Sequence, residues 1–93
     1  MDGIDGSLLR PWLDLSESRV GHRLVLAATG EVDIASAGIL REALSGAAES
    51  GAAQIWLDLT NVEFMDSTGI TAIVDAHRLL ESRATSGKLL LTV

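Results

Sequence analysis

The sequence has no cysteine, one proline and three aromatic residues among its 93 positions. Without cysteine there is no disulfide framework, thiolate metal site or cysteine nucleophile. The scarcity of aromatic residues means that the core must be built almost entirely from leucine, isoleucine, valine and alanine. Because 47% of the residues are hydrophobic, the chain can form one small core, but it is too short for a second domain.

Basic clusters and long apolar runs are also absent. The formal net charge is -6, so nucleic-acid binding lacks its usual electrostatic driving force. No apolar run approaches the roughly 20 residues needed to cross a bilayer, and the acidic first residues lack the basic start and apolar stretch of a secretory signal. We therefore expect a cytoplasmic protein without membrane insertion, whose partners are other proteins.

The N-terminal part of the sequence predicts a hairpin. Leu13 and Leu15, followed by the stretch 20–29, indicate two short antiparallel strands. The turn between them falls either at 16–18 or at 19–22, because both stretches carry turn-forming residues.

Residues 34–49 predict an amphipathic helix. Its apolar face is expected to contain Ile34, Ala37, Leu40 and Leu44. Asp33 can cap this helix by accepting hydrogen bonds from the free N–H groups of the first turn, and Gly51 follows where a helix stop is expected.

A second strand and helix follow. Ile55, Leu57 and Leu59 alternate with polar neighbours, as in a strand, and a loop is expected over 60–66. The period then changes to that of a helix over residues 67–83. The apolar stripe of this helix is expected to contain Ile70, Ile73, Val74, His77 and Leu80.

A turn at 85–87 and an apolar strand at 88–93 complete the pattern. Strands and helices in alternation indicate an α/β fold, a mixed sheet with right-handed parallel crossovers. We expect residues 1–7 to form a flexible leader and residues 8–93 to form a single domain.

The tetrapeptide Asp66-Ser67-Thr68-Gly69 lies where a buried strand passes into a helix. Asp66 or Ser67 can each cap that helix, so alone the tetrapeptide indicates only a helix start. It belongs, however, to an ordered set of motifs. These are Gly30-Glu31-Val32-Asp33, Leu57-Asp58-Leu59, Phe64-Met65-Asp66-Ser67-Thr68-Gly69 and Gly87-Lys88-Leu89.

This set resembles the STAS family of anti-sigma-factor antagonists, whose pattern includes Gly-Glu-Leu-Asp and Met-Asp-Ser-Ser-Gly elements in this order. The resemblance extends from about Leu13 to Val93. It implies that Ser67 accepts phosphate from an anti-sigma factor that is also an ATP-dependent serine kinase, and that a PP2C-type phosphatase removes it. The unphosphorylated form would bind the anti-sigma factor and release the sigma factor, so the chain would be a substrate without a cofactor.

The candidate partner contacts are Asp33, Asp66, Thr68, Gly69, Thr71 and Asp75. Asp33 and Asp66 have an alternative role as helix caps, and Thr68 is an alternative phosphate acceptor. Gly69 leaves space for the active site of a partner. The last two continue the Ser67 side along the helix, unless Asp75 simply pairs with Arg78.

An enzyme is not expected. A hydrolase would need a base beside Ser67, but His77 lies about 15 Å along the helix. It is better interpreted as a core or boundary residue, and His22 as a turn or surface residue. Two isolated histidines make no metal site, and the stretch 85–88 lacks the first glycine of a phosphate-binding loop.

Members of the STAS family usually continue with another helix after the strand at 88–93, whereas this chain ends at Val93. The end is either natural or that of a shortened piece. We expect the apolar surface left there to favour a homodimer or a partner complex. The alternative function is a STAS scaffold without a phosphate switch, or an accessory subunit of a lipid-transport or stress-signalling complex.

Overall fold

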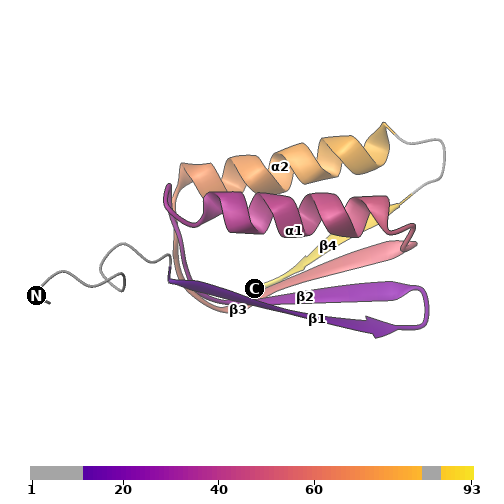
Figure 1. Cartoon of the computed structure of the whole chain (residues 1–93), viewed down its shortest axis with the longest axis horizontal. Helices are drawn as coiled ribbons and strands as arrows, with labels where there is room; N and C mark the ends of the chain where they lie inside the picture. Colours follow the sequence, from indigo (N-terminus) through magenta and orange to yellow (C-terminus); the bar gives the residue numbers. More distant parts are fainter. Residues whose placement is uncertain (1–11, 83–86) are drawn as a thin grey trace, which may run out of the picture.

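The computed structural model describes residues 12–82 and 87–93. The elements follow in the order β1 (Leu13–Val20), β2 (Arg23–Val32), α1 (Ala37–Glu49), β3 (Gln54–Met65), α2 (Ser67–Glu81) and β4 (Lys88–Thr92). The four strands form one sheet in the order β1-β2-β3-β4, and both helices cover the same face of it (Figure 1). This confirms the α/β class; the expected leader lies outside the described residues.

The hairpin of β1 and β2 is antiparallel, and Val20 pairs with Arg23. Gly21 and His22 form the turn, where Gly21 has a φ of 62° that glycine adopts without steric penalty. The later of the two expected turns is confirmed, and β2 begins at Arg23 instead of Val20. His22 lies at the surface, as expected.

The other strand pairs are parallel. β3 pairs with β2 on one side and with β4 on the other, and α1 and α2 make the two crossovers. The mixed sheet and the last strand are therefore confirmed. None of the helices in residues 12–82 and 87–93 is long and apolar enough to span a membrane.

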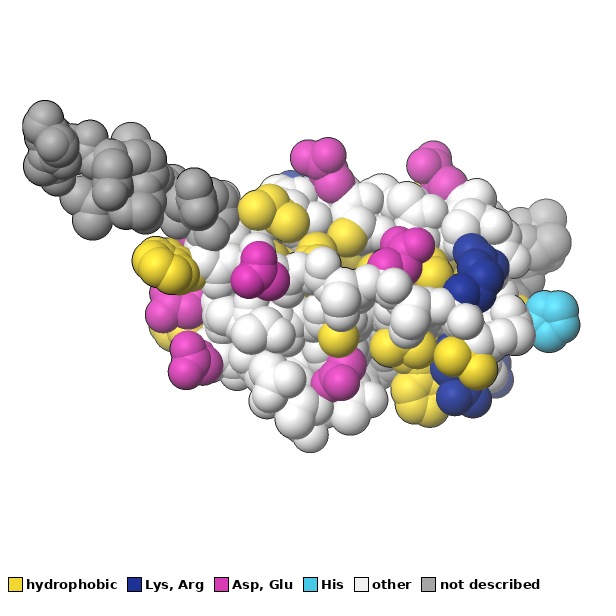
Figure 2. All heavy atoms as spheres, turned by 60° about the horizontal axis from the view of Figure 1, so that its bottom comes forward, with side chains coloured by type: hydrophobic (Ala, Val, Ile, Leu, Met, Phe, Trp, Pro, Cys, Tyr) yellow, Lys and Arg dark blue, Asp and Glu magenta, His cyan; other side chains and the backbone are white. Residues whose placement is uncertain are grey.

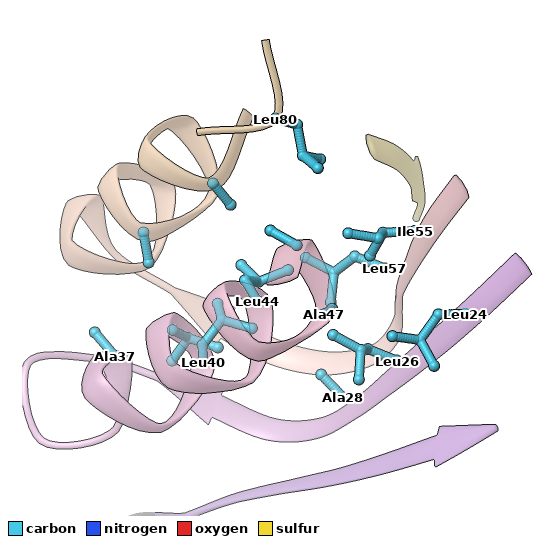
Figure 3. Close-up of a cluster of buried hydrophobic side chains, with 14 of the residues drawn as sticks. Leu24, Leu26, Ala28, Ala37, Leu40, Leu44, Ala47, Ile55, Leu57 and Leu80 are labelled. Carbon is cyan, nitrogen blue, oxygen red and sulfur yellow. The ribbon is translucent and has the colours of Figure 1, made fainter. Parts of the chain in front are cut away.

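The core lies between the sheet and the helices (Figure 3). It is formed by alternate residues of β2 and β3 and by the inner sides of α1 and α2. Its largest fully buried side chains are Leu24, Leu26, Leu40, Leu44, Ile55, Leu57, Val32 and Ser36. Trp12 and Phe64 are exposed, so the core contains the aliphatic residues that the composition predicted.

The first helix begins later than expected. Residues 34–36 form a turn, and α1 starts at Ala37. Ile34, assigned to the apolar face, is 84% exposed because it precedes the helix and does not share its periodicity. The other three residues of that predicted face are buried.

The predicted inner stripe of the second helix is wrong at three of its five residues, whereas Leu80 is buried and Ile73 packs against the core as expected. Ile70 is 55% exposed and Val74 is 41% exposed, and the His77 side chain lies outside, 3.4 Å from Glu81. The buried residues are Gly69, Ala72, Ala76 and Leu80. A Cβ on Gly69 would lie 2.6 Å from Val32 Cγ1 and 2.8 Å from Met65 Cγ, so small residues are what allow α2 to approach the sheet.

The predicted loop at 60–66 is also wrong, because β3 continues to Met65. Its second half remains paired with β2 through two register shifts, until Val32 lies opposite Met65. The side chains there are mostly half-buried or exposed. Backbone pairing with β2 continues through this half of the strand, although its side chains show no alternating hydrophobic pattern; only Val62 and Met65 pack against the core.

Charge is unevenly distributed over the sheet side of the molecule. Lysine and arginine side chains gather at the end that carries the β1–β2 turn, and acidic side chains spread over the rest (Figure 2). The sheet register places Arg23, Gln54 and Lys88 in one row at that end, and the Arg23 guanidinium lies 4.5 Å from the centre of the Trp56 ring. The tetrapeptide starting at Asp66 lies at the opposite end.

Candidate functional site

The site is formed where β2 and β3 end side by side. Val32 pairs with Met65, and the N–H of Asp66 donates to the carbonyl of Val32 at 3.1 Å. Because parallel strands end at the same edge of a sheet, Asp33 and Asp66 follow neighbouring strand ends. The polar residues predicted from two separate motifs are thus brought together.

Asp66 caps α2. Its backbone is extended, and its Oδ1 accepts hydrogen bonds from the N–H of Thr68 at 2.9 Å and from the Thr68 hydroxyl. The Thr68 hydroxyl is the main reason that the pKa of Asp66 lies below its ordinary value, and burial acts in the opposite direction. Asp66 is therefore ionised at neutral pH. Of the two residues predicted as possible caps, Asp66 and Ser67, it is Asp66 that caps the helix.

Asp33 organises the turn before α1 and is not its N-cap. Its Oδ1 accepts hydrogen bonds from the N–H groups of Ala35 at 2.9 Å and Ser36 at 3.2 Å. The N-cap is Ser36, which makes no side-chain hydrogen bond to the helix. The prediction that Asp33 caps the helix is therefore wrong, and Asp33 instead accepts hydrogen bonds within the turn that precedes the helix.

Ser36 is a residue that the sequence analysis missed. It is the one buried polar side chain among the described residues. Its hydroxyl donates to the carbonyl of Glu31 at 2.8 Å and accepts from the N–H of Asp33 at 3.0 Å. The spacing of Asp33 and Ser36, three residues apart with reciprocal hydrogen bonds, resembles a capping box and was the available signal.

Ser67 is the first residue of α2, and it is exposed. Within the described part of the chain its hydroxyl has no hydrogen-bond partner, whereas the hydroxyls of both neighbouring threonines have one. Thr68 donates to Asp66, and Thr71 donates to the carbonyl of Ser67 at 2.9 Å. Of these three hydroxyls, that of Ser67 is therefore the one without a hydrogen-bond partner in the described part of the chain.

A hollow of about 380 Å³ lies beside Ser67, between the first halves of α1 and α2. Its lining residues are Ile34, Ala37, Gly38, Arg41, Ser67, Thr68 and Thr71. Arg41 is the charged residue of this lining. Its Nη2 lies 3.9 Å from Asp75 Oδ2, and both side chains are 50% exposed, so Asp75 pairs across the helices and not with Arg78.

Gly69 is buried beneath this surface. The clash that a Cβ would make with Val32 and Met65 shows that the packing of α2 requires glycine here. The remaining candidate residues lie at the surface or half-buried around Ser67. No group of three or more histidine, aspartate or glutamate side chains within residues 12–82 and 87–93 is placed to hold a metal ion.

Comparison with known proteins gives matches over most of the chain. The family model for the STAS domain matches residues 16–92. The anti-sigma-B factor antagonist of Bacillus subtilis (strain 168) is 40% identical over 60 residues, which are 64% of this chain and 54% of that protein. The matched segment thus spans about half the length of that relative.

Solved structures share the fold. An anti-sigma factor antagonist from Mycobacterium paratuberculosis superposes with a TM-score of 0.74 at 19% identity, covering 85% of this chain and 67% of that one; at this identity it shows the fold alone. The anti-sigma factor antagonist SpoIIAA in its unphosphorylated form has a TM-score of 0.68 at 28% identity, covering 84% and 71%.

The Bacillus cell fate determinant SpoIIAA in its phosphorylated form has a TM-score of 0.65 at 27% identity, covering 82% of this chain and 68% of that one. The family match, over residues 16–92, covers 77 of the 93 residues, and these structures share the α/β fold described above. The chain therefore belongs to the STAS domain family, and its relatives include anti-sigma factor antagonists.

Proposed function

We propose that this chain is a cytoplasmic anti-sigma-factor antagonist that phosphorylation of Ser67 switches off. One observation carries this proposal: Ser67 is exposed at the start of α2, and its hydroxyl has no partner within the described residues. A relative at 27–28% identity is known in both an unphosphorylated and a phosphorylated form. The site lies inside the single STAS domain that we propose for residues 8–93.

The hydrogen bonds favour Ser67 over its neighbours as the acceptor. Phosphorylation of Thr68 would remove the hydroxyl proton that it donates to Asp66 and place a second negative charge against that carboxylate. Thr71 would lose its bond to the backbone of the first turn. Ser67 loses no such interaction, so its modification leaves the helix start intact.

The phosphoryl transfer requires a partner that holds ATP. An anti-sigma factor with serine kinase activity would transfer the γ-phosphoryl group to Ser67 Oγ, take up the hydroxyl proton on a base of its own and release ADP. A PP2C-type phosphatase would add water to the phosphoserine and release inorganic phosphate. This chain is the substrate in both steps and supplies no catalytic group.

The phosphate acts at the partner surface. It adds about -1.5 to -2 charges and three strong acceptors, which a partner must desolvate in a close contact. The residues that we propose contact the partner are Ser67, Asp33, Asp66, Thr68, Thr71 and Asp75. Gly69 is buried, and we assign it to the placement of the helix start below that surface.

The test is phosphorylation by candidate anti-sigma kinases with ATP, followed by intact and peptide mass spectrometry. We expect one phosphate on Ser67, none on the Ser67→Ala variant, and weaker kinase binding by the phosphorylated chain. Ser82→Ala, at the far end of α2, is the matched control and should still be phosphorylated. Phosphate on Thr68 alone, or none with any candidate, would contradict the proposal.

The alternative is a STAS scaffold or an accessory subunit of a transport complex without a phosphate switch. In that interpretation Ser67 serves only as a helix cap, but Asp66 already fills that position. Constitutive binding that is unchanged by Ser67→Ala and by Ser67→Asp would favour the scaffold.

We further propose that two copies of the chain associate through β4. This strand is at an edge of the sheet, and Leu91 and Val93 are exposed on it and just after it. Exposed apolar edge strands readily pair with another chain. Analytical ultracentrifugation should show a dimer that Leu91→Glu converts to a monomer; a monomer at high micromolar concentration would contradict the proposal.

A further inference from the structure

One positively charged side chain, that of Arg41, lines the hollow beside Ser67. Arg41 reaches it from α1, whereas Ser67, Thr68 and Thr71 reach it from α2. Its lining includes no carboxylate residue. A phosphate attached to Ser67 would therefore enter a space whose one charged side chain has the opposite sign.

The present partner of Arg41 holds it weakly. The separation of 3.9 Å from Asp75 exceeds an ordinary charge-assisted hydrogen bond, and both side chains are half exposed. Exposed ion pairs of this kind contribute little to stability. A phosphate dianion carries more charge than a carboxylate, and its oxygens match the planar guanidinium group in a bidentate manner.

The geometry permits an exchange of partners within the molecule. Ser67, Thr71 and Asp75 follow at intervals of four residues, so they lie along one side of α2. Arg41 lines the hollow at Ser67 and Thr71 and contacts Asp75 one turn further on. Arg41 therefore borders both the hollow at Ser67 and the carboxylate at the other end of this row.

We propose that phosphorylation of Ser67 draws Arg41 from Asp75 to the phosphate. This inference rests on the proposed function, because it requires phosphoserine at position 67. Arg41 then fixes the phosphate against the chain's own surface, while the Asp75 carboxylate loses its cation two turns away. The partner thus meets an altered charge over the length of two helical turns, and Arg41 is the positioning residue that transmits the change.

The experiment measures the second ionisation of the phosphate, which is ordinarily at a pKa of about 6. Phosphoserine is introduced at position 67 during synthesis by an expanded genetic code, so no kinase is needed, and the phosphate is titrated by ³¹P NMR at physiological salt. Arg41 favours the dianion and lowers this pKa. We expect Arg41→Gln to raise it by about half a pH unit.

The matched control is Arg78→Gln, which removes the same charge from α2. Arg78 is about 16 Å along the helix from Ser67, beyond the screening length of about 8 Å at physiological salt, and it does not line the hollow. Its replacement should leave the titration almost unchanged. An Arg41→Gln shift no larger than the Arg78→Gln shift would overturn the inference.

Asp75→Asn tests the exchange itself. Removing the competing carboxylate should lower the pKa of the phosphate further, and this effect should vanish when Arg41→Gln is present, because Asp75 acts through Arg41. An effect of equal size in both backgrounds would overturn the exchange. The outcome is separate from the proposed function: a chain that no kinase modifies contradicts that function, whereas an unchanged titration contradicts only the role of Arg41.

Discussion

The two helices lie on the same face of the sheet but use their apolar residues in opposite ways. α1 turns Leu40 and Leu44 into the core. α2 turns mainly small residues inward, with Leu80 as the exception, and leaves Ile70 and Val74 exposed. α1 therefore contributes more large side chains to the core, whereas α2 leaves two large apolar side chains on the side of the molecule where we propose that the partner binds.

The largest expected effect is on the free energy of unfolding, and it distinguishes a core residue of α1 from a surface residue of α2. Leu40→Ala removes a fully buried side chain and should lower the free energy of unfolding by about 2–5 kcal/mol. Ile70→Ala, at an exposed position, should change it by less than about 0.5 kcal/mol. Urea unfolding of both variants measures the difference. Equal losses would show that both helices contribute equally to the core.

A glycine pair sharpens the comparison. Gly69→Ala on α2 places a Cβ 2.6 Å from Val32, and overpacking of this kind should lower the free energy of unfolding by about 1–3 kcal/mol. Gly38→Ala on α1 meets nothing within 4 Å and should raise it by about 0.5–1 kcal/mol, since alanine is the better helix former. Thermal unfolding of the two variants would decide; a stabilised Gly69→Ala variant would break the contrast.

This contrast explains why only one helical face could be predicted. Hydrophobic periodicity identified Leu40 and Leu44 because large apolar residues do face the core in α1. In α2 the close approach to Val32 and Met65 requires small residues, and that requirement depends on the distance between layers, which periodicity does not contain. The stripe with Ile70 and Val74 was therefore assigned to the wrong side.

The site was predicted in part for similar reasons. The motif order predicted the position of Ser67 at a helix start, and the cap at Asp66 follows from local hydrogen bonding. The pairing of Arg41 with Asp75 was not predictable, because it depends on how two helices pack. Ser36 could have been singled out from its spacing to Asp33, but its burial depends on how α1 packs on the sheet, which the sequence does not show.

Partner binding, unlike stability, should depend more on α2 than on α1. Ile70→Ala on α2 should weaken binding to the anti-sigma factor about tenfold, or about 1.4 kcal/mol, without changing thermal stability. Ile39→Ala is the matched control, because it shortens an exposed isoleucine in the same way but on α1. Isothermal titration calorimetry measures both; a larger loss with Ile39→Ala would assign the contact surface to α1.

The smallest effect concerns the helix starts. The Asp66 cap of α2 is ionised, and its pKa lies below the ordinary value of 3.8 because Thr68 donates to it; α1 has a serine cap without a side-chain bond. Because the folded-state pKa is the lower one, the stabilisation exists above pH 3.8 and disappears as the pH falls through the folded value.

Asp66→Asn tests this dependence. The wild type should be slightly more stable than Asp66→Asn at pH 7, and the difference should diminish on acidification below pH 4. A stability gap for Asp66→Asn that persists in strong acid would show that the negative charge of the cap is unimportant.

The connection between β3 and α2 has a consequence for timing. Asp66 is the single residue between the two elements, and it is fixed to β2 through the carbonyl of Val32. Because this connection is short and held by a backbone hydrogen bond, we expect that the proposed phosphorylation of Ser67 starts no slow rearrangement of the backbone. Exposed side chains reorient within picoseconds to nanoseconds, and the duration of the signal would therefore equal the lifetime of one phosphoester bond.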